Sequence, residues 1–175
     1  MLNTTLIYIE RDGCYLMLHR TKKENDLNHD KWIGVGGKCE EDESPEECAR
    51  REALEETGLT LGDLCYHGIV TFVSDEYEGE YMHLFSCSDY SGTVKDCPEG
   101  DLVWVPKEEV PELPSWEGDR IFLKIMAAPH PFFSLKLCYE GDSLVSRDLH
   151  FYGDPLFGEK EKERVDFAGQ TPYNN

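Results

Sequence analysis

Short β-rich runs recur along the chain and are separated by residues that favour turns. The first two runs flank Asp12-Gly13, and Asp-Gly between such runs is a strong hairpin signal. A second hairpin is expected around Gly141-Asp142, and the polar residues 20–31 predict a loop. The predicted strands cover residues 4–10, 14–20, 65–73, 80–87, 102–106, 132–140 and 143–149.

Two segments carry helix signals. The first begins at Ser44-Pro45-Glu46-Glu47, which supplies an N-cap serine, a proline at the first helical position and a glutamate at the third. Gly58 is a C-terminal stop, so we expect a helix over residues 45–57. Apolar residues at helical spacing predict a second helix over 117–128. Those residues are Ile121, Phe122, Ile125 and Met126.

Strands and helices mix along the chain without a repeat or a linker. This mixture predicts one α/β or α+β sandwich domain over residues 1–150, with a short helical turn at 107–110 after Pro106. The length of 175 residues is enough for such a domain to bury a core. Residues 151–175 are polar and are expected to form a loose tail.

The chain is strongly acidic, with a formal net charge of -19. This charge argues against general affinity for nucleic-acid backbones or anionic membranes, and a cation is expected to help if the protein binds phosphates. No apolar run approaches the length of a membrane span, and no export signal is visible. The 7 cysteines include no C-x-x-C pair and resemble reduced thiols, which predicts a cytoplasmic protein without a zinc site.

The helix expected at 45–57 gathers carboxylates on one side. Glu52, Glu55 and Glu56 fall within an arc of about 100°, where mutual repulsion raises their pKa values unless positive charge is nearby. A hard divalent cation, Mg²⁺ or Mn²⁺, would relieve that repulsion and could bridge to a diphosphate. The alternative is a solvated acidic helix. Arg51 could orient a neighbouring glutamate, and Lys38 could contact a phosphate.

The spacing of these residues resembles the Nudix box. Gly37 is followed after five residues by Glu43, and after seven more by residues 51–59, Arg-Glu-Ala-Leu-Glu-Glu-Thr-Gly-Leu. The resemblance implies the Nudix fold, a mixed β-sheet sandwich flanked by helices, and hydrolysis of a nucleoside diphosphate linked to another group.

By this resemblance, Glu52, Glu55 and Glu56 are metal-site carboxylates, and the carbonyl of Gly36 completes the metal site. Glu52 is expected to help deprotonate or orient the attacking water. Arg51 is placed among the catalytic-site residues, with Glu43, as a group that holds the loop against the helix.

Residues 31–38, 68–76, 81–85 and 99–119 are also similar to the oxidised purine nucleoside triphosphatases, especially the bacterial 8-oxo-dGTP diphosphatases. This resemblance implies that Trp116 stacks on the base. It also implies that Asp119 reads the base edge and that Glu99 is a further metal carboxylate. Glu117 and Phe72 are further candidate substrate-binding residues, and Lys38 and Lys23 could contact the phosphates.

Each of these assignments has a structural alternative. Trp116 and Phe72 could be core aromatics, Asp119 a helix N-terminal carboxylate and Lys23 a solvated loop residue. One departure from the resemblance is Ile33, since animal relatives carry asparagine there and isoleucine has no polar group for a base. With fewer polar groups facing the base, the site is expected to accept several purine triphosphates.

Three functions are consistent with the sequence. The first is a Mg²⁺-dependent diphosphatase that releases pyrophosphate from a purine nucleoside triphosphate, preferably 8-oxo-dGTP. The second keeps this chemistry but acts on another nucleotide or on RNA 5′ ends. The third is a nucleotide-sensing module without turnover, which the intact set of box glutamates argues against.

Overall fold

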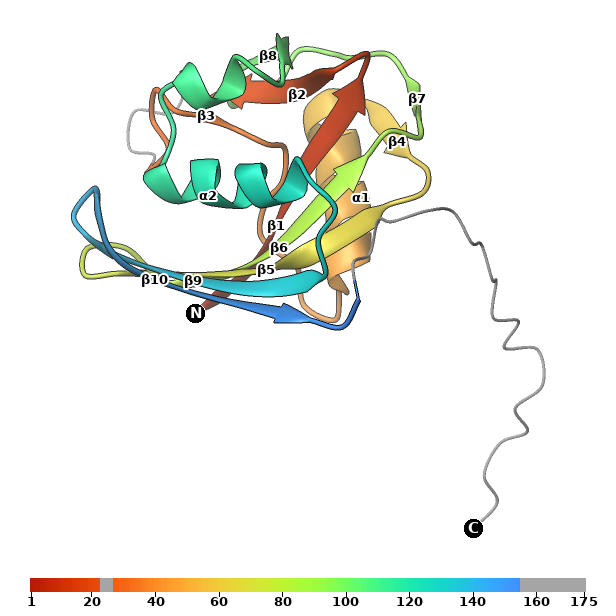
Figure 1. The fold of residues 1–175 in the computed structure, drawn as a ribbon. Helices are drawn as coiled ribbons and strands as arrows, with labels where there is room; N and C mark the ends of the chain where they lie inside the picture. The colour runs from red at the N-terminus through yellow and green to blue at the C-terminus, as the bar shows by residue number, and fades with distance from the viewer. Residues whose placement is uncertain (23–26, 155–175) are drawn as a thin grey trace.

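The computed structural model describes residues 1–22 and 27–154, which form a twisted mixed sheet with one helix against each face (Figure 1). The helices are α1 (Pro45–Thr57), α2 (Glu117–Met126) and a short 3₁₀-helix (Val110–Glu112). The strands are β1 (Leu2–Arg11), β2 (Cys14–His19), β3 (Trp32–Ile33), β4 (Leu59–Leu61), β5 (Cys65–Ser74), β6 (Glu80–Cys87), β7 (Tyr90–Gly92), β8 (Asp101–Pro106), β9 (Phe132–Glu140) and β10 (Ser143–Tyr152).

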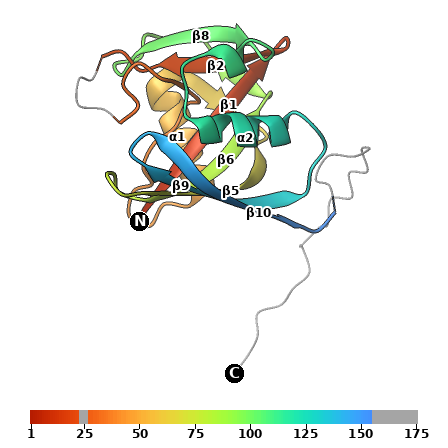
Figure 2. The same ribbon diagram turned by 60° about the vertical axis from the view of Figure 1, so that its left-hand side comes forward.

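The larger sheet has the strand order β10-β9-β5-β6-β1-β2-β3, and β8 pairs with β2. The β1–β6 and β5–β9 pairs are parallel, whereas the hairpins β1–β2, β5–β6 and β9–β10 are antiparallel. Figure 2 shows β2 and β8 at the opposite end of the molecule from β9 and β10. The expected α+β class, a mixed sheet flanked by helices, is confirmed.

The first helix forms as its local sequence predicts. Ser44 accepts a hydrogen bond from the Glu47 backbone, and the Glu47 side chain accepts one from the Ser44 backbone, which completes a capping box. Gly58 ends the helix with φ of 78°, a left-handed conformation that glycine adopts without steric cost. The bounds of α1 therefore match the prediction over residues 45–57.

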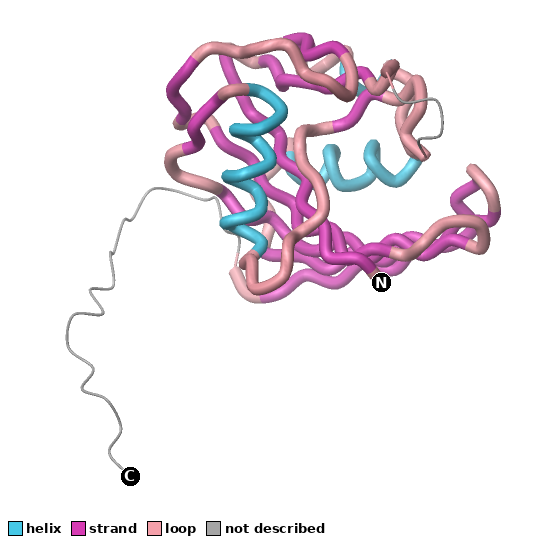
Figure 3. The backbone as a smooth tube through the Cα atoms, turned by 180° about the vertical axis from the view of Figure 1, so that it is seen from behind, coloured by secondary structure: helices cyan, strands magenta, loops and turns pink. Residues whose placement is uncertain are grey.

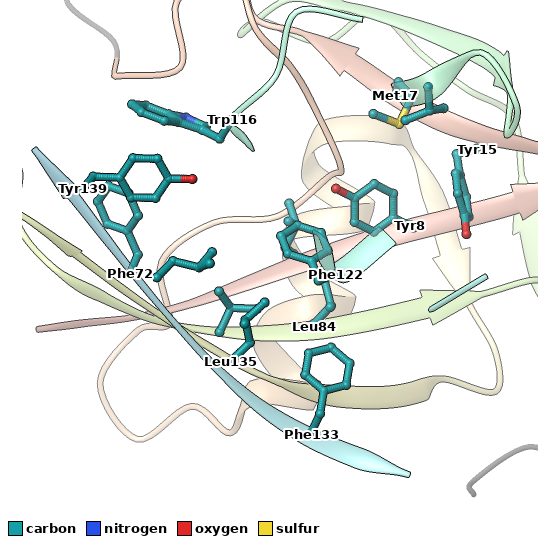
Figure 4. Packing of buried hydrophobic residues seen from close by; sticks show 14 of the residues in the cluster. Tyr8, Tyr15, Met17, Phe72, Leu84, Trp116, Phe122, Phe133, Leu135 and Tyr139 are labelled. Atoms are coloured by element: carbon teal, nitrogen blue, oxygen red, sulfur yellow. The ribbon is translucent and has the colours of Figure 1, made fainter. Parts of the chain in front are cut away.

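Each face of the sheet has its own core, because side chains alternate along a strand. On the α1 face, Ile7 and Phe85 pack against Ala49 and Ala53. Figure 3 shows the fold from behind, where α1 lies in front of the strands. The α2 face is more aromatic, with buried residues that come from six strands, the 3₁₀-helix, α2 and the loop before α2 (Figure 4). Its largest side chains are Tyr8, Tyr15, Phe72, Trp116, Phe122, Phe133 and Tyr139.

Some elements differ from the prediction. β3, β4 and β7 were not expected, because strands of two or three residues are too short to show alternation and depend on partners distant in sequence. The helical turn expected at 107–110 was misplaced. Pro106 is still paired with Cys14 in the sheet, and the 3₁₀-helix follows at 110–112, where Pro111 occupies an early helical position.

The last strand extends two residues past the expected domain end at 150, because Phe151 and Tyr152 pair with Phe133 and Phe132. The rest of the expected tail, from residue 155, lies outside the described residues, and the division at 150 stays a prediction. Within the described residues, no helix is both long enough and apolar enough to cross a membrane.

Candidate active site

The loop before α1 is held against β1 by backbone hydrogen bonds. The backbone N–H of Thr5 donates to the Gly37 carbonyl at 2.8 Å, and Ile7 and Val35 exchange two further bonds. Gly36 has φ of 151°, and a Cβ there would lie 2.1 Å from the Thr5 carbonyl oxygen. A side chain at Gly37 would likewise lie 2.6 Å from the Glu52 carboxylate. Glycine at both positions therefore brings the loop onto the acidic helix.

Arg51 connects the loop to the carboxylates of α1. Its Nε and Nη2 donate to the two oxygens of Glu43 at 2.8 and 2.9 Å, and Nη2 also donates to the Lys38 carbonyl at 3.1 Å. Nη1 donates to Glu52 at 2.8 Å and to Glu55 at 3.2 Å. The Arg51 hydrogen bonds lower the pKa of Glu43 to about 2. Arg51 therefore joins Glu43 and the Lys38 carbonyl of the loop to Glu52 and Glu55 of α1.

Glu56 is the most buried of the box carboxylates. It is 6% exposed and accepts a hydrogen bond from the Gly36 backbone at 3.0 Å. Burial raises its pKa to about 8, and the negative charges of Glu99 and Glu52 add to the rise. Burial also raises the pKa of Glu52, in part against the effect of Arg51. Glu52, Glu56 and Glu99 therefore lie close enough to repel one another.

A cavity of about 280 Å³ opens beside this loop, between the sheet and the start of α2. The Gly36–Lys38 segment forms one wall, and Arg20, which is ion-paired with Glu99, lies at the same cavity. The cavity thus adjoins the acidic helix without including its glutamates. Five predicted site residues line it: Gly36, Lys38, Phe72, Trp116 and Asp119.

Trp116 forms part of the cavity wall just before α2. Its Nε1 donates to the Asn28 side chain at 2.8 Å, and its ring packs edge-on against Phe72 and Tyr139 at centroid distances of 6.0 and 5.2 Å. The Lys31 ammonium lies 4.3 Å from the ring centroid. The ring is 8% exposed and held from several sides, so its orientation is fixed (Figure 4).

Asp119 reaches the cavity from the first turn of α2. It is 7% exposed, and burial raises its pKa to about 7, although the backbone at Trp116 and the charges of Lys31 and Arg120 oppose the shift. The Tyr139 hydroxyl accepts a hydrogen bond from the Gly118 backbone at 2.8 Å and so holds this end of the helix against β9.

The structure does not bring Glu117 to the cavity, which corrects its expected role as a substrate-binding residue. Glu117 is exposed and lies at a separate depression between α2 and β10. The reason is helical geometry, because residues two apart on a helix point about 200° away from each other and Asp119 points inward. The predicted phosphate residue Lys23 lies outside the described residues.

The NUDIX domain family matches residues 2–124, well over half of the chain. The chain belongs to the Nudix family. An oxidized purine nucleoside triphosphate hydrolase of Danio rerio is 31% identical over 149 residues, which cover 83% of this chain and 92% of the relative. The CTP pyrophosphohydrolase of Escherichia coli is 30% identical over 132 residues, which cover 73% of this chain and 93% of the relative.

Solved structures agree with this family. The crystal structure of a mutator MutT protein from Bacillus halodurans has a TM-score of 0.75 and 28% identity, and the match covers 85% of this chain and 97% of that one. Membership implies a Nudix pyrophosphohydrolase that acts on a phosphoric anhydride in a nucleotide-type substrate.

Nudix hydrolases typically use a divalent metal ion, and the acidic site has the donors for one. Among the described residues, no three His, Cys, Asp or Glu side chains converge as a ready metal site. Instead, Glu52 and Glu55 accept hydrogen bonds from Arg51, and Glu99 pairs with Arg20. The repulsion among Glu52, Glu56 and Glu99 and their oxygen-only donor set nevertheless fit a hard cation such as Mg²⁺.

Several cavity residues of this Nudix protein were missed from the sequence. Asn28 lies in a loop and carried no signal, and the role of Tyr139 depends on the distant Gly118. The sequence did carry a signal for Glu80, because alternation along β6 places this residue on the same face as Met82 and Leu84. A carboxylate at an inward position of a strand is unusual and points to a site.

Proposed function

We propose that this protein is a Mg²⁺-dependent diphosphatase that cleaves a purine nucleoside triphosphate, preferably 8-oxo-dGTP, to the monophosphate and pyrophosphate. Such an activity would remove oxidised nucleotides from the cytoplasmic pool before DNA synthesis. The observation that supports this best is the position of the aromatic cavity, directly beside the loop that rests on the Nudix-box glutamates.

In this proposal the base enters the cavity and stacks on Trp116, with Asp119 at its edge and Phe72 against the wall. Because Asp119 is buried with a pKa of about 7, its protonated form can both donate and accept a hydrogen bond. Lys38 and Arg20 line the same cavity and contribute positive charge for the phosphates.

The metal would be held by the Gly36 carbonyl with Glu52, Glu56 and Glu99, and with Glu55 once it separates from Arg51. A bound divalent cation would neutralise phosphate charge and lower the pKa of an attacking water. Glu52 would orient that water or accept its proton, and Arg51 would keep Glu52 and the loop in position.

The test is a comparison of kcat/KM for 8-oxo-dGTP, dGTP and CTP with Mg²⁺, with the products separated by chromatography. A preference of about tenfold for the oxidised base, with monophosphate and pyrophosphate released, would support the proposal; this corresponds to about 1.4 kcal/mol. Equal rates for 8-oxo-dGTP and dGTP would leave a general purine triphosphatase. Faster turnover of CTP would favour a pyrimidine substrate, as the name of the E. coli relative suggests.

Absence of turnover would direct the search to RNA 5′ ends or to a sensing role. Metal-dependent turnover that disappears in Glu52→Gln would distinguish an enzyme from a sensor.

A further inference from the structure

Glu80 is an inward-facing carboxylate in the wall of the cavity. It is the first residue of β6 and lies between Leu2 of β1 and Phe72 of β5 in the sheet register. All three residues line the cavity, as does Met82 two positions along the strand. The alternation of β6 therefore directs Glu80 toward the ligand space.

One oxygen of the Glu80 carboxylate has no hydrogen-bond partner among the described residues. The Thr4 hydroxyl donates to its Oε2 at 2.9 Å. Within residues 1–22 and 27–154, no Lys, Arg or His forms an ion pair with Glu80, and Oε1 forms no hydrogen bond. Burial raises the pKa of Glu80, and the charge of Glu78 adds to the rise, while the Thr4 hydrogen bond lowers it. Oε1 is not fully buried, so it can accept a hydrogen bond from a ligand that enters the cavity.

The cavity therefore presents carboxyl groups from two different walls. Asp119 extends from α2, whereas Glu80 extends from the sheet below it. Apolar side chains, among them Leu6, Met82 and Leu137, line much of the cavity, and Ile33 adds no polar group, while the cationic Arg20 and Lys38 also line it. The side-chain oxygen of Asn28 already accepts from Trp116. A flat ligand in this space would meet hydrogen-bond acceptors at two separate edges.

Guanine does not match two such edges. It offers N–H donors on its Watson–Crick edge, but the opposite edge carries only the acceptors N7 and O6. Oxidation at C8 places a hydrogen on N7 and turns this acceptor into a donor. A carboxylate opposite N7 would therefore repel guanine and accept a hydrogen bond from 8-oxoguanine.

The geometry points to Glu80 as a specificity-determining residue, whose carboxylate accepts a hydrogen bond from the N7–H of an oxidised purine and disfavours the unoxidised base. Thr4 is its positioning residue. This inference rests on the proposed function, since it assigns the base-selecting group within that same cavity.

The first experiment measures kcat/KM for 8-oxo-dGTP and dGTP in wild type, Glu80→Gln and Glu80→Leu. The amide of Gln can donate as well as accept, so it would tolerate either form of N7. We expect the ratio of the two kcat/KM values to fall about tenfold or more in both variants. Thr4→Val, which removes the positioning hydroxyl with little change of shape, should lower the ratio by a smaller factor.

Glu10→Gln is the matched control. Glu10 lies near the far end of β1 and is paired with Lys107 at 2.6 Å, away from the cavity. The substitution removes one negative charge, as Glu80→Gln does, and should leave the ratio of kcat/KM for 8-oxo-dGTP to dGTP unchanged. An unchanged ratio in a folded Glu80→Gln protein would overturn the inference, even if wild type prefers 8-oxo-dGTP.

Binding of the monophosphates separates this inference from the proposed function. Calorimetry without metal compares 8-oxo-dGMP with dGMP on wild type and Glu80→Gln. If wild type hydrolyses no purine triphosphate, the proposed function fails. A preference for 8-oxo-dGMP that disappears in Glu80→Gln would still support the role of Glu80. Equal binding of both monophosphates by wild type would overturn it.

Discussion

The two faces of the central sheet carry two kinds of site. On the α1 face, the carboxylates contact partners close in sequence: Arg51 and Glu43 are 8 residues apart, and Gly36 and Glu56 are 20 apart. On the α2 face, Trp116 contacts Asn28 across 88 residues and Thr4 contacts Glu80 across 76. Apart from Glu99, which pairs with Arg20 across 79 residues, the acidic site comes from one continuous segment, whereas the cavity is assembled from many. The comparison indicates that reaction class belongs to the first region and substrate choice to the second.

The strongest test of this division is Glu56→Gln. We expect kcat/KM to fall about 100-fold or more for every nucleotide tested, because Glu56 is a metal ligand in the proposed function. The melting temperature without metal should change little, since Glu56 with a pKa of about 8 is largely uncharged at pH 7 and the glutamine oxygen can still accept from the Gly36 backbone. Glu46→Gln on the exposed side of the same helix should retain activity. A selective loss for one nucleotide would contradict the division.

Arg51→Lys should have the next largest effect. Lysine cannot reproduce the bidentate pair with Glu43 while also holding Glu52 and the Lys38 carbonyl. We expect kcat to fall about 10- to 100-fold, with an unchanged ratio between 8-oxo-dGTP and dGTP. Steady-state kinetics on both nucleotides check this. A change in the ratio would mean that the α1 face also selects the base.

Trp116→Ala tests the other face. Loss of the stacking surface should raise KM for nucleotides about tenfold, within the range of about 1–3 kcal/mol per stacked base. The effect on kcat should be smaller. Trp104→Ala is the matched control, because Trp104 stacks with Tyr90 and Arg11 outside the cavity. It should lower the melting temperature without raising KM. Equal effects of both changes on KM would indicate general destabilisation.

Asp119→Asn should give the smallest effect, seen in the pH dependence of stability. The pKa of Asp119 is about 7 in the folded protein against 3.8 for an ordinary aspartate, so its stabilising contribution is complete below about pH 4 and is lost as the pH rises through 7. The stability of wild type relative to the variant should therefore decrease between pH 5 and pH 8. Urea unfolding at pH 5 and pH 8 measures the free energy of unfolding of both proteins. An equal difference between them at the two pH values would contradict the raised pKa of Asp119.

Prediction from sequence succeeded where the signals were local. The capping box at Ser44, the stop at Gly58 and the two main hairpins appear as expected. It failed for β3, β4 and β7, whose two or three residues form strands only because distant partners reach them. For Glu117 it failed because proximity in sequence was taken as proximity in space, although the helix turns that side chain away from Asp119.

The sequence by itself determined the acidic helix, the glycine loop beside it and therefore the class of reaction, because these contacts lie within about two helical turns or one loop of each other. Only the tertiary structure decided which side chains share the cavity. Glu80, Thr4 and Asn28 became its neighbours through the register of β1 with β6 and the packing of α2 on the sheet. Such contacts depend on pairings between distant segments, which periodicity in one segment cannot specify.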